Sequence, residues 1–313
     1  MDTYQDNVLV VLANESYLEH AKHLFVSAKS VGGWTGDLCL MKFGTKTKGD
    51  DWFLQNNIFI YYIEKGMWGD VPENTELLLS KFHIVNPYMK KWSKLLFLDC
   101  DIIINGSLQG LLRFKGHHAV PGIEFPYLKS RLSIPNFINI FRYISYKKFE
   151  SSINVDGLGF NGGVYLIDLD EISDCTFEDG LLFFKRNRKF LNIKFGDEAL
   201  MASFFSGRIK PLPLCYNVFM KFITVNSGIV LHFLGKDKPW HESHLMYETY
   251  CENLRLASDF SSLKPLKSYS MNEIKKIEKD YQDLLEPTYL EVSNQSLDEF
   301  KALYNHLFME WKR

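Results

Sequence analysis

Two short, uninterrupted apolar runs restrict the fold of this chain more than any other feature of its sequence. Residues 8–12 read Val-Leu-Val-Val-Leu, and residues 94–98 read Lys-Leu-Leu-Phe-Leu. A strand with one solvent-exposed face alternates apolar and polar residues. These runs do not alternate, so they indicate strands buried on both faces. Such strands are typical of a parallel sheet that is covered by helices on each side.

The segments around these runs alternate between strand and helix patterns. We expect further strands at residues 38–43 and 58–63, and helices at about residues 17–30 and 77–86, the second of which stops near Pro87. This order predicts an α/β fold with a Rossmann-like, mostly parallel sheet flanked by helices. In such sheets, ligands bind at the carboxyl ends of the strands.

The C-terminal part of the chain has a different pattern. Residues 270–285 and 296–311 place apolar side chains at helical spacing, and each segment begins with a capping box. Pro287 predicts that the first helix ends near residue 285. We therefore expect residues 1–255 to form the main domain and residues 256–313 to be a helical extension packed on it. A partner interface and a membrane-surface contact are the alternatives.

The composition excludes several classes of protein. The 313 residues carry a formal net charge of −2, without the basic excess of a nucleic-acid-binding protein. The five cysteines are scattered and form no Cys-x-x-Cys pair, which favours a reducing compartment. No apolar run approaches the ~20 residues that span a bilayer, and the polar N-terminus is unlike a signal peptide. We expect a cytoplasmic protein with no transmembrane segment and no nucleic-acid partner.

Two carboxylates directly follow the apolar run at residues 94–98. Asp99 and Asp101 are two residues apart, which in a strand places both side chains on one face and that of Cys100 on the other. Like charges this close are unfavourable unless a positive charge lies between them. A divalent cation meets that need and leaves positions open for phosphate oxygens. The alternative is a pair of turn or cap residues.

A second candidate cluster lies in residues 231–240. A short apolar strand ends at His232, and a turn at Gly235 is followed by Lys236 and Lys238. An imidazole can complete the coordination of a metal, and lysines can neutralise a diphosphate. The alternative is a core histidine followed by an ordinary basic loop.

Two more segments place polar residues beside apolar ones. Asn161 and Gly162 precede a predicted strand, where glycine lets the backbone approach a ligand and the amide can donate to and accept from sugar hydroxyls. Asp197 and Glu198 open a predicted helix. The structural alternatives are a tight turn for the first segment and a helix cap with a favourable dipole interaction for the second.

Together and in this order, these segments resemble glycosyltransferase family 8, which includes glycogenins, galactinol synthases and bacterial lipopolysaccharide galactosyl- and glucosyltransferases. The resemblance extends over about residues 8–240. Residues 80–83 are similar to the Thr-Lys-Leu-His segment of glycogenins, and residues 96–101 to the family's Asp-x-Asp strand. Residues 232–240 are close to its His-Phe-x-Gly-x-x-Lys-Pro-Trp signature.

The resemblance implies a GT-A fold and a metal-dependent enzyme that transfers a hexose from a UDP-sugar, UDP-glucose or UDP-galactose being favoured, with retention of anomeric configuration. It implies Mn²⁺ as the cofactor, with Mg²⁺ as a substitute. By matching positions, Asp99, Asp101 and His232 would ligate the metal. Gly235 and Lys238 would contact the diphosphate.

The same matching assigns the rest of the donor site. Lys81, Asn161 and Asp197 would act near the reacting sugar and are the catalytic candidates. The end of the first strand would hold the uridine. The remaining donor-binding candidates are Leu12, Asn14, Tyr17, Cys100, Gly162 and Glu198.

Some positions depart from the glycogenin pattern. Glu198 stands where glycogenins have glutamine, and Leu158 where they have an acidic residue, so the donor sugar and the reacting geometry stay open. Glycogenins also carry an acceptor tyrosine between a Tyr-Asn pair and the metal-binding histidine. Here the interval between Asn217 and His232 contains no tyrosine. We therefore expect an external acceptor such as a glycan.

The sequence leaves three further questions open. Residues 127–149 mix basic and aromatic side chains, which fits either an acceptor-binding lid or a solvated helix with an apolar underside. The chain could form a homodimer. The competing functions are a homologue that binds a nucleotide sugar or glycan without transfer, and a metal-dependent nucleotide-sugar hydrolase.

Overall fold

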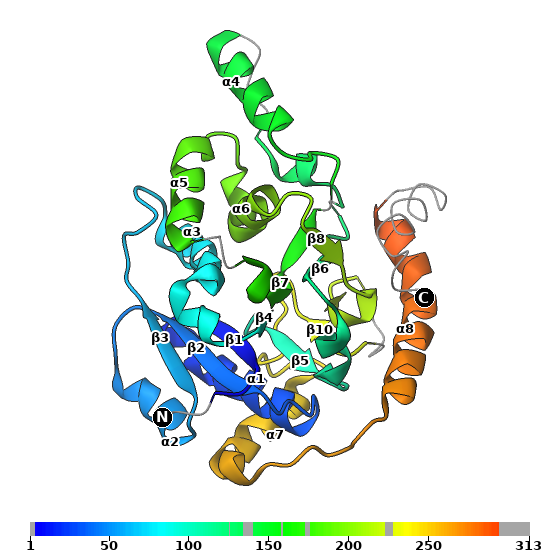
Figure 1. Cartoon of the computed structure of the whole chain (residues 1–313). Helices are drawn as coiled ribbons and strands as arrows, with labels where there is room; N and C mark the ends of the chain where they lie inside the picture. The colour runs from blue at the N-terminus through cyan, green and yellow to red at the C-terminus, as the bar shows by residue number, and fades with distance from the viewer. Residues whose placement is uncertain are drawn as a thin grey trace.

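A seven-stranded sheet of order β3-β2-β1-β4-β7-β6-β8 forms the centre of the molecule (Figure 1). The computed structural model describes residues 4–124, 126–133, 140–157, 159–172, 176–222 and 228–293. The first four strands are parallel, β7 is antiparallel to both its neighbours, and β8 is parallel to β6. The strands are β1 (Asn7–Ala13), β2 (Asp37–Phe43), β3 (Phe59–Ile63), β4 (Lys94–Leu98), β6 (His117–Pro121), β7 (Phe160–Asp168) and β8 (Ile209–Pro211).

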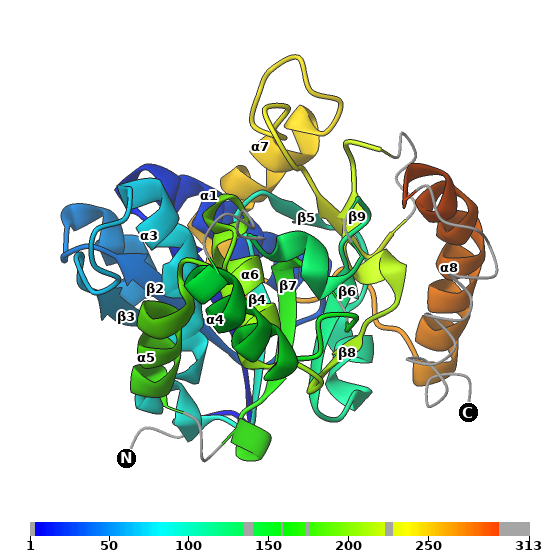
Figure 2. The same ribbon diagram turned by 90° about the horizontal axis from the view of Figure 1, so that it is seen from above.

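Helices cover both faces of this sheet. Leu9 and Val11 of β1 share a core cluster with helix α1, whereas Val8 and Val10 share the opposite one with α3, α5 and α6. Figure 2 shows α8 as a separate column on the side of the molecule away from α3 and α5. The helices are α1 (Leu18–Ser30), α2 (Asp51–Gln55), α3 (Glu73–Leu79), α4 (Ile140–Ser151), α5 (Phe177–Asn187), α6 (Gly196–Phe204), α7 (Tyr247–Leu256) and α8 (Met271–Ser293).

The observed elements confirm the predicted α/β class. Each of β1, β2, β3, β4 and α1 begins and ends within one residue of its predicted bounds. Every residue from Val8 to Ala13 is buried, as expected for a strand covered on both faces. The apolar runs were therefore a reliable guide to the centre of the sheet.

The prediction of a helix over residues 77–86 is wrong in its bounds and partly in its type. Helix α3 begins at Glu73 and ends at Leu79, and Ser80–Val85 continue as a 3₁₀ helix, η3. Within η3 the buried Lys81 bonds Asp99 and the carbonyl oxygen of Gly162. Asn86 is extended, because the following proline disfavours helical backbone.

A small second sheet of order β5-β10-β9 lies beside the carboxyl end of β4. Its strands are β5 (Ile102–Ile104), β9 (Val218–Phe219) and β10 (Val230–His232). Strands β5 and β10 are antiparallel, and their register pairs His232 with Ile102, the residue after Asp101. This pairing brings the histidine to the carboxylates across more than a hundred residues of chain.

Helix α8 does not end before Pro287 as predicted but continues through it to Ser293. Its predicted capping box is confirmed by mutual hydrogen bonds between Ser270 and Glu273. A proline inside a helix costs about 3 kcal/mol. Beyond it, the buried Tyr289 packs in the core and donates to the carbonyl oxygen of Pro121, a contact that offsets the lost helical hydrogen bond.

Three sequence predictions concern the outer parts of the chain. The second C-terminal helix, residues 296–311, lies outside the described residues. Within residues 127–149, helix α4 projects beyond the rest of the molecule (Figure 1), with Tyr146 and Phe149 buried and Phe141 79% exposed. Among the described residues, no helix is long and apolar enough to cross a membrane.

Candidate active site

Three potential metal ligands converge at the carboxyl edge of the central sheet. One oxygen each of Asp99 and Asp101 and a ring nitrogen of His232 all lie within 4.8 Å of one another. Asp101 Oδ1 is 3.1 Å from His232 Nε2. Two carboxylates and an imidazole are a suitable donor set for a divalent cation, so the residues fit the metal that the sequence predicts.

Backbone pairing fixes these three residues. Strand β4 ends at Leu98, and the N–H of Asp99 then donates to the carbonyl oxygen of Gly163 at 3.0 Å. The N–H of Phe233 donates to the carbonyl oxygen of Asp101, also at 3.0 Å. Both carboxylates therefore lie where strands from two sheets meet.

Lys238 lies next to this cluster, as the sequence predicts. Its ammonium donates to Asp101 Oδ2 and, at 2.6 Å, to the carbonyl oxygen of Phe233. Burial alone would raise the pKa of Asp101, but the neighbouring His232 and Lys238 outweigh burial and hold that pKa well below its usual range. Asp101 therefore stays ionised and available as a ligand.

A buried lysine joins the metal cluster to a second carboxylate. Lys81 Nζ lies 2.9 Å from Asp99 Oδ1 and 3.3 Å from Asp197 Oδ2. Burial raises the pKa of Asp197 to about 7, with Glu198 adding to the rise and Lys81 opposing it. A carboxyl group with a strongly perturbed pKa beside a candidate metal site is a typical functional feature.

Asp197 is not a helix cap. The N-cap position of α6 is Phe195, without a side-chain cap bond. The carboxylate of Asp197 instead accepts a hydrogen bond from the hydroxyl of Tyr165 at 3.1 Å and is only 3% exposed. The structure thus excludes a side-chain cap by Asp197, although Asp197 and Glu198 do lie in the first turn of α6, where a helix dipole favours negative charge.

Glu198, the residue that differs from glycogenins, has its own counter-charge. Its Oε2 is 3.2 Å from Arg131 Nε, and its Oε1 accepts from the N–H of Gly162 and from Asn161 Nδ2, each at 3.0 Å. Burial raises the pKa of Glu198, and Arg131 opposes that rise. Arg131 thus balances the charge of the partly buried Glu198, which stands where glycogenins have a neutral glutamine.

Gly162 and Gly163 lie inside strand β7, not before it as predicted. A Cβ atom on Gly162 would overlap the carboxylate of Asp197, and one on Gly163 would overlap the ring of His232. These glycines therefore make room for two side chains of the site itself. The expectation that Gly162 also admits a ligand to the backbone stays a prediction.

Asn161 is also more restricted than its sequence suggests. Its Oδ1 accepts from the N–H of Gly163 and from Asn217 Nδ2, both at 3.0 Å, while its Nδ2 donates to Glu198. Both lone pairs of the amide oxygen are thus used. One N–H remains for a ligand, so Asn161 can donate to a sugar hydroxyl but not accept from it.

The predicted uridine-binding residues follow β1, next to the cluster. Tyr17 is 38% exposed and contacts the rings of His20 and Trp240, and those two rings stack at 3.7 Å. Asn14 Oδ1 accepts from Ser16. Among the other donor-site candidates, Leu12 is buried, the thiol of Cys100 donates to the carbonyl oxygen of Leu12, and Gly235 is exposed with φ of 81°.

Sequence reasoning missed the roles of four residues that complete the site, one of which, Asn217, it named only as part of the Tyr-Asn pair. Tyr165 contacts Asp197, Arg131 pairs with Glu198, Asn217 bonds His232, and His20 stacks on Trp240. Only Tyr165 carried a usable signal, since it lies four residues after Asn161 and strand spacing puts both on one face. Leu158, the other departure from glycogenins, lies outside the described residues.

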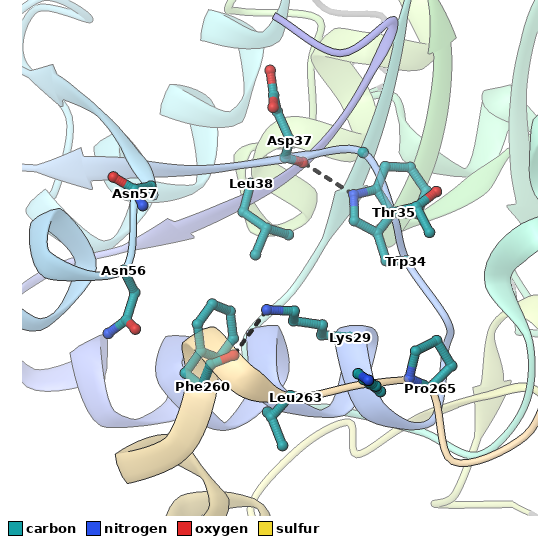
Figure 3. Close-up of a pocket in the computed structure, with 12 residues that line it drawn as sticks. Lys29, Trp34, Thr35, Asp37, Leu38, Asn56, Asn57, Phe260, Leu263 and Pro265 are labelled. Carbon is teal, nitrogen blue, oxygen red and sulfur yellow. Dashed lines mark hydrogen bonds between the residues drawn. The ribbon is translucent and has the colours of Figure 1, made fainter.

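A cavity of about 380 Å³ lies apart from the candidate metal cluster (Figure 3). Its lining includes Trp34 and Asp37, at the amino end of β2, whereas the metal cluster is at the carboxyl end of the parallel β4. Lys29 Nζ and Trp34 Nε1 already donate to backbone carbonyl oxygens. We therefore do not assign this cavity to the candidate active site.

A family model identifies the chain. The model described as glycosyl transferase family 8 matches residues 60–244, more than half of the sequence. The chain therefore belongs to glycosyltransferase family 8, and this membership supports a sugar transferase. No curated protein sequence matches it at a significant level.

Solved structures confirm the predicted GT-A fold. An active-site variant of LgtC has a TM-score of 0.60 at 16% identity, covering 79% of this chain and 94% of LgtC. The galactosyltransferase LgtC with donor and acceptor sugar analogues gives 0.58 at 16%, covering 79% and 95%. The bifunctional glycosyltransferase WbbM gives 0.59 at 16%, covering 84% and 53%. At this identity the likeness shows the fold alone.

Proposed function

We propose that this chain is a retaining, metal-dependent hexosyltransferase that moves a hexose from a UDP-sugar, with UDP-glucose or UDP-galactose favoured, to the hydroxyl of an external acceptor such as a glycan. The observation that carries this proposal is the convergence of Asp99, Asp101 and His232 beside Lys238. Family membership supports the transfer of a sugar, and the acidic cluster supports its dependence on a metal.

The metal and the lysine would act on the leaving group. Asp99, Asp101 and His232 would hold the cation, which supplies positive charge to the departing diphosphate. We favour Mn²⁺ over Mg²⁺, because an imidazole ligand suits a transition metal better than a hard, oxygen-seeking cation. Lys238 would add its charge beside Asp101, and the exposed turn at Gly235 leaves room for phosphate.

The carboxylates deeper in the site would act on the sugar. Asp197 would stabilise the positive charge that develops at the anomeric carbon, and Lys81 holds this side chain next to the metal ligand Asp99. Asn161 would donate its remaining N–H to a sugar hydroxyl. Glu198 has both carboxylate oxygens engaged, so we assign it to shaping the sugar pocket rather than to attack.

The residues after β1 would bind the base. The exposed ring of Tyr17 offers a surface on which a uracil could stack, and Asn14 is partly exposed beside it. The rings of His20 and Trp240 stack on each other, and each makes an edge contact with the ring of Tyr17. The predicted cytoplasmic location, the peripheral membrane contact and the homodimer stay predictions.

A donor screen followed by an acceptor library tests the proposal. Purified protein is incubated with UDP-glucose, UDP-galactose and other nucleotide sugars in Mn²⁺, in Mg²⁺ and in chelator, and UDP release is measured. We expect release in Mn²⁺, less in Mg²⁺ and none in chelator, with strong stimulation by the true acceptor. Nuclear magnetic resonance of the purified product then gives the anomeric configuration.

The competing functions predict other results. A hydrolase would release UDP at a rate that no acceptor changes, and a binding-only homologue would bind the donor without releasing UDP. Full activity in chelator would refute the metal-dependent mechanism. An inverted product would refute retention but not the transferase assignment.

A further inference from the structure

We propose that Asn217 is a positioning residue that keeps the proton of the His232 ring on Nδ1 and thereby presents Nε2 to the cation. Its consequence for catalysis rests on the proposed metal-dependent function. The hydrogen-bond arrangement does not, because it follows from side chains within the protein. The metal cluster does not include this asparagine, and the sequence motifs name it only as part of the Tyr-Asn pair, without a role at the metal.

A chain of hydrogen bonds links His232 to Glu198 through two amide side chains. His232 Nδ1 lies 2.9 Å from Asn217 Oδ1. Asn217 Nδ2 lies 3.0 Å from Asn161 Oδ1, and Asn161 Nδ2 lies 3.0 Å from Glu198 Oε1. His232 is 2% exposed and Asn217 is 1% exposed, so water cannot easily replace these partners.

The donor and the acceptor of each hydrogen bond in this series are fixed by backbone N–H groups at its Glu198 end. Glu198 Oε1 accepts from the backbone N–H of Gly162, and the N–H of Gly163 donates to the amide oxygen of Asn161. Asn161 must therefore turn its NH₂ group toward Glu198 and its oxygen toward Asn217. Asn217 must then donate with Nδ2, which leaves its oxygen facing His232.

An amide oxygen is only an acceptor, so His232 Nδ1 must carry a proton. In the neutral ring, Nε2 is then the bare nitrogen, and it faces Asp101 Oδ1 at 3.1 Å. Two acceptors at this distance require a proton or a cation between them. The geometry points to Nε2 as the ligand atom, in the way that outer-shell partners commonly orient metal-binding histidines.

A second buried histidine provides an internal contrast. His23 Nε2 lies 3.1 Å from the carbonyl oxygen of Ile102, so Nε2 must carry the proton. Asn253 Nδ2 lies 3.2 Å from His23 Nδ1 and donates to it. The two Asn–His pairs thus fix opposite tautomers, and the His23 pair contains no carboxylate.

Long-range proton–nitrogen correlation spectra of the ¹⁵N-labelled, metal-free protein at alkaline pH test the tautomers directly. We expect His232 to carry its proton on Nδ1 and His23 to carry it on Nε2. A His232→Gln spectrum assigns the signals. A neutral His232 ring with a bare Nδ1 would overturn the proposal, whether or not the protein proves to be a transferase.

Titration with Mn²⁺, followed by the electron paramagnetic resonance of the free ion, tests the consequence. Asn217→Leu removes the acceptor and should weaken Mn²⁺ binding about 10–100-fold. Asn217→Asp keeps an oxygen acceptor for His232 Nδ1 but loses the donor to Asn161 Oδ1, and should lose less affinity than Asn217→Leu. Asn253→Leu, the matched control, should leave Mn²⁺ affinity unchanged although it also removes a buried amide.

Two results of the titration would overturn the role assigned to Asn217. The first is wild-type Mn²⁺ affinity in a folded Asn217→Leu protein. The second is an equal loss in Asn217→Leu and Asn217→Asp, which would indicate that the asparagine only maintains packing. If Asn217→Leu does not fold, the spectra of the wild-type protein still show which nitrogen of His232 carries the proton, and so still test the proposal. If the expected tautomers and Mn²⁺ binding are observed but no sugar is transferred, the result contradicts the proposed function and leaves the role of Asn217 standing.

Discussion

Two buried ionic clusters in this protein contain similar groups but differ in their charge balance. Beneath α8, the carboxylate of Glu278 pairs with Arg113 and accepts from the hydroxyl of Tyr216, so one negative charge meets one positive charge. At the carboxyl edge of the sheet, four acidic side chains among the described residues meet His232 and three lysine or arginine side chains. The acids are Asp99, Asp101, Asp197 and Glu198, and the bases are Lys81, Arg131 and Lys238.

This difference in charge balance distinguishes the cluster around Glu278, which has a structural role, from the cluster at the sheet edge, to which we assign a functional one. The balanced cluster completes its own hydrogen bonds and fixes α8 to the rest of the molecule. In the second cluster, ligand atoms of Asp99, Asp101 and His232 face one another within 4.8 Å, an arrangement that suits a bound divalent cation. Neutralising an acid should therefore cost activity in the second cluster and stability in the first.

Asp101→Asn should have the largest effect on activity. It removes a metal ligand that also contacts His232 and Lys238, so we expect turnover to fall by about 10³-fold or more. The melting temperature of the metal-free protein should fall, though by less than in Glu278→Ala, because Asp101 is more exposed than Glu278 and relief of its repulsion with Asp99 offsets part of the lost pairing with Lys238. Initial rates in Mn²⁺ and a thermal melt check both expectations. Full turnover by the Asp101→Asn variant, in Mn²⁺ or in chelator, would contradict the proposed metal site.

Glu278→Ala should have the largest effect on stability. Removing one partner of a buried ion pair typically costs 3–5 kcal/mol. We expect about 3 kcal/mol, the lower end of this range, because the side chain of Arg113 remains 20% exposed. Urea unfolding measures the change in the free energy of unfolding. Turnover per folded molecule should fall far less than in Asp101→Asn, and an equal loss would show that the two clusters are not separable.

Asp197→Asn should reduce kcat by about 10²-fold with a smaller change in KM, which corresponds to ~2.7 kcal/mol of transition-state stabilisation. The reason is the proposed location of this charge beside the anomeric carbon, next to Lys81 and Tyr165. Steady-state kinetics on the preferred donor measure the split between kcat and KM. A near-normal kcat in a folded variant would show that the buried carboxylate has only a structural role.

The same residue should give the metal-free protein a measurable pH dependence. The pKa of Asp197 rises from its ordinary 3.8 to about 7 on folding, so between these values the folded state binds more protons than the unfolded state. The free energy of unfolding should therefore fall as pH rises from about 4 to about 7, by at most ~1.4 kcal/mol per pH unit. Urea unfolding at several pH values measures this slope. Asp197→Asn should flatten it.

Local patterns in the sequence determined the centre of the fold and predicted the three residues of the candidate metal site. Burial of a strand on both faces requires a continuous apolar run, so β1 and β4 could be predicted within one residue. The spacing of Asp99 and Asp101 after β4 follows from the same strand geometry. The sequence motifs also assigned Asn161, Asp197 and His232 to the same candidate site.

The tertiary structure decided which groups these residues meet. Because β7 is antiparallel to β4, its first residues reach the carboxyl edge, and only there does Asn161 contact Glu198 and Asn217. Packing across the chain likewise supplied Arg131 as the partner of Glu198, and Tyr289 as the contact that carries α8 past its proline. Apolar periodicity is local and can be recognised along the chain. The partner of a buried charge is set by segments that are distant in sequence, because only folding brings them within hydrogen-bond distance.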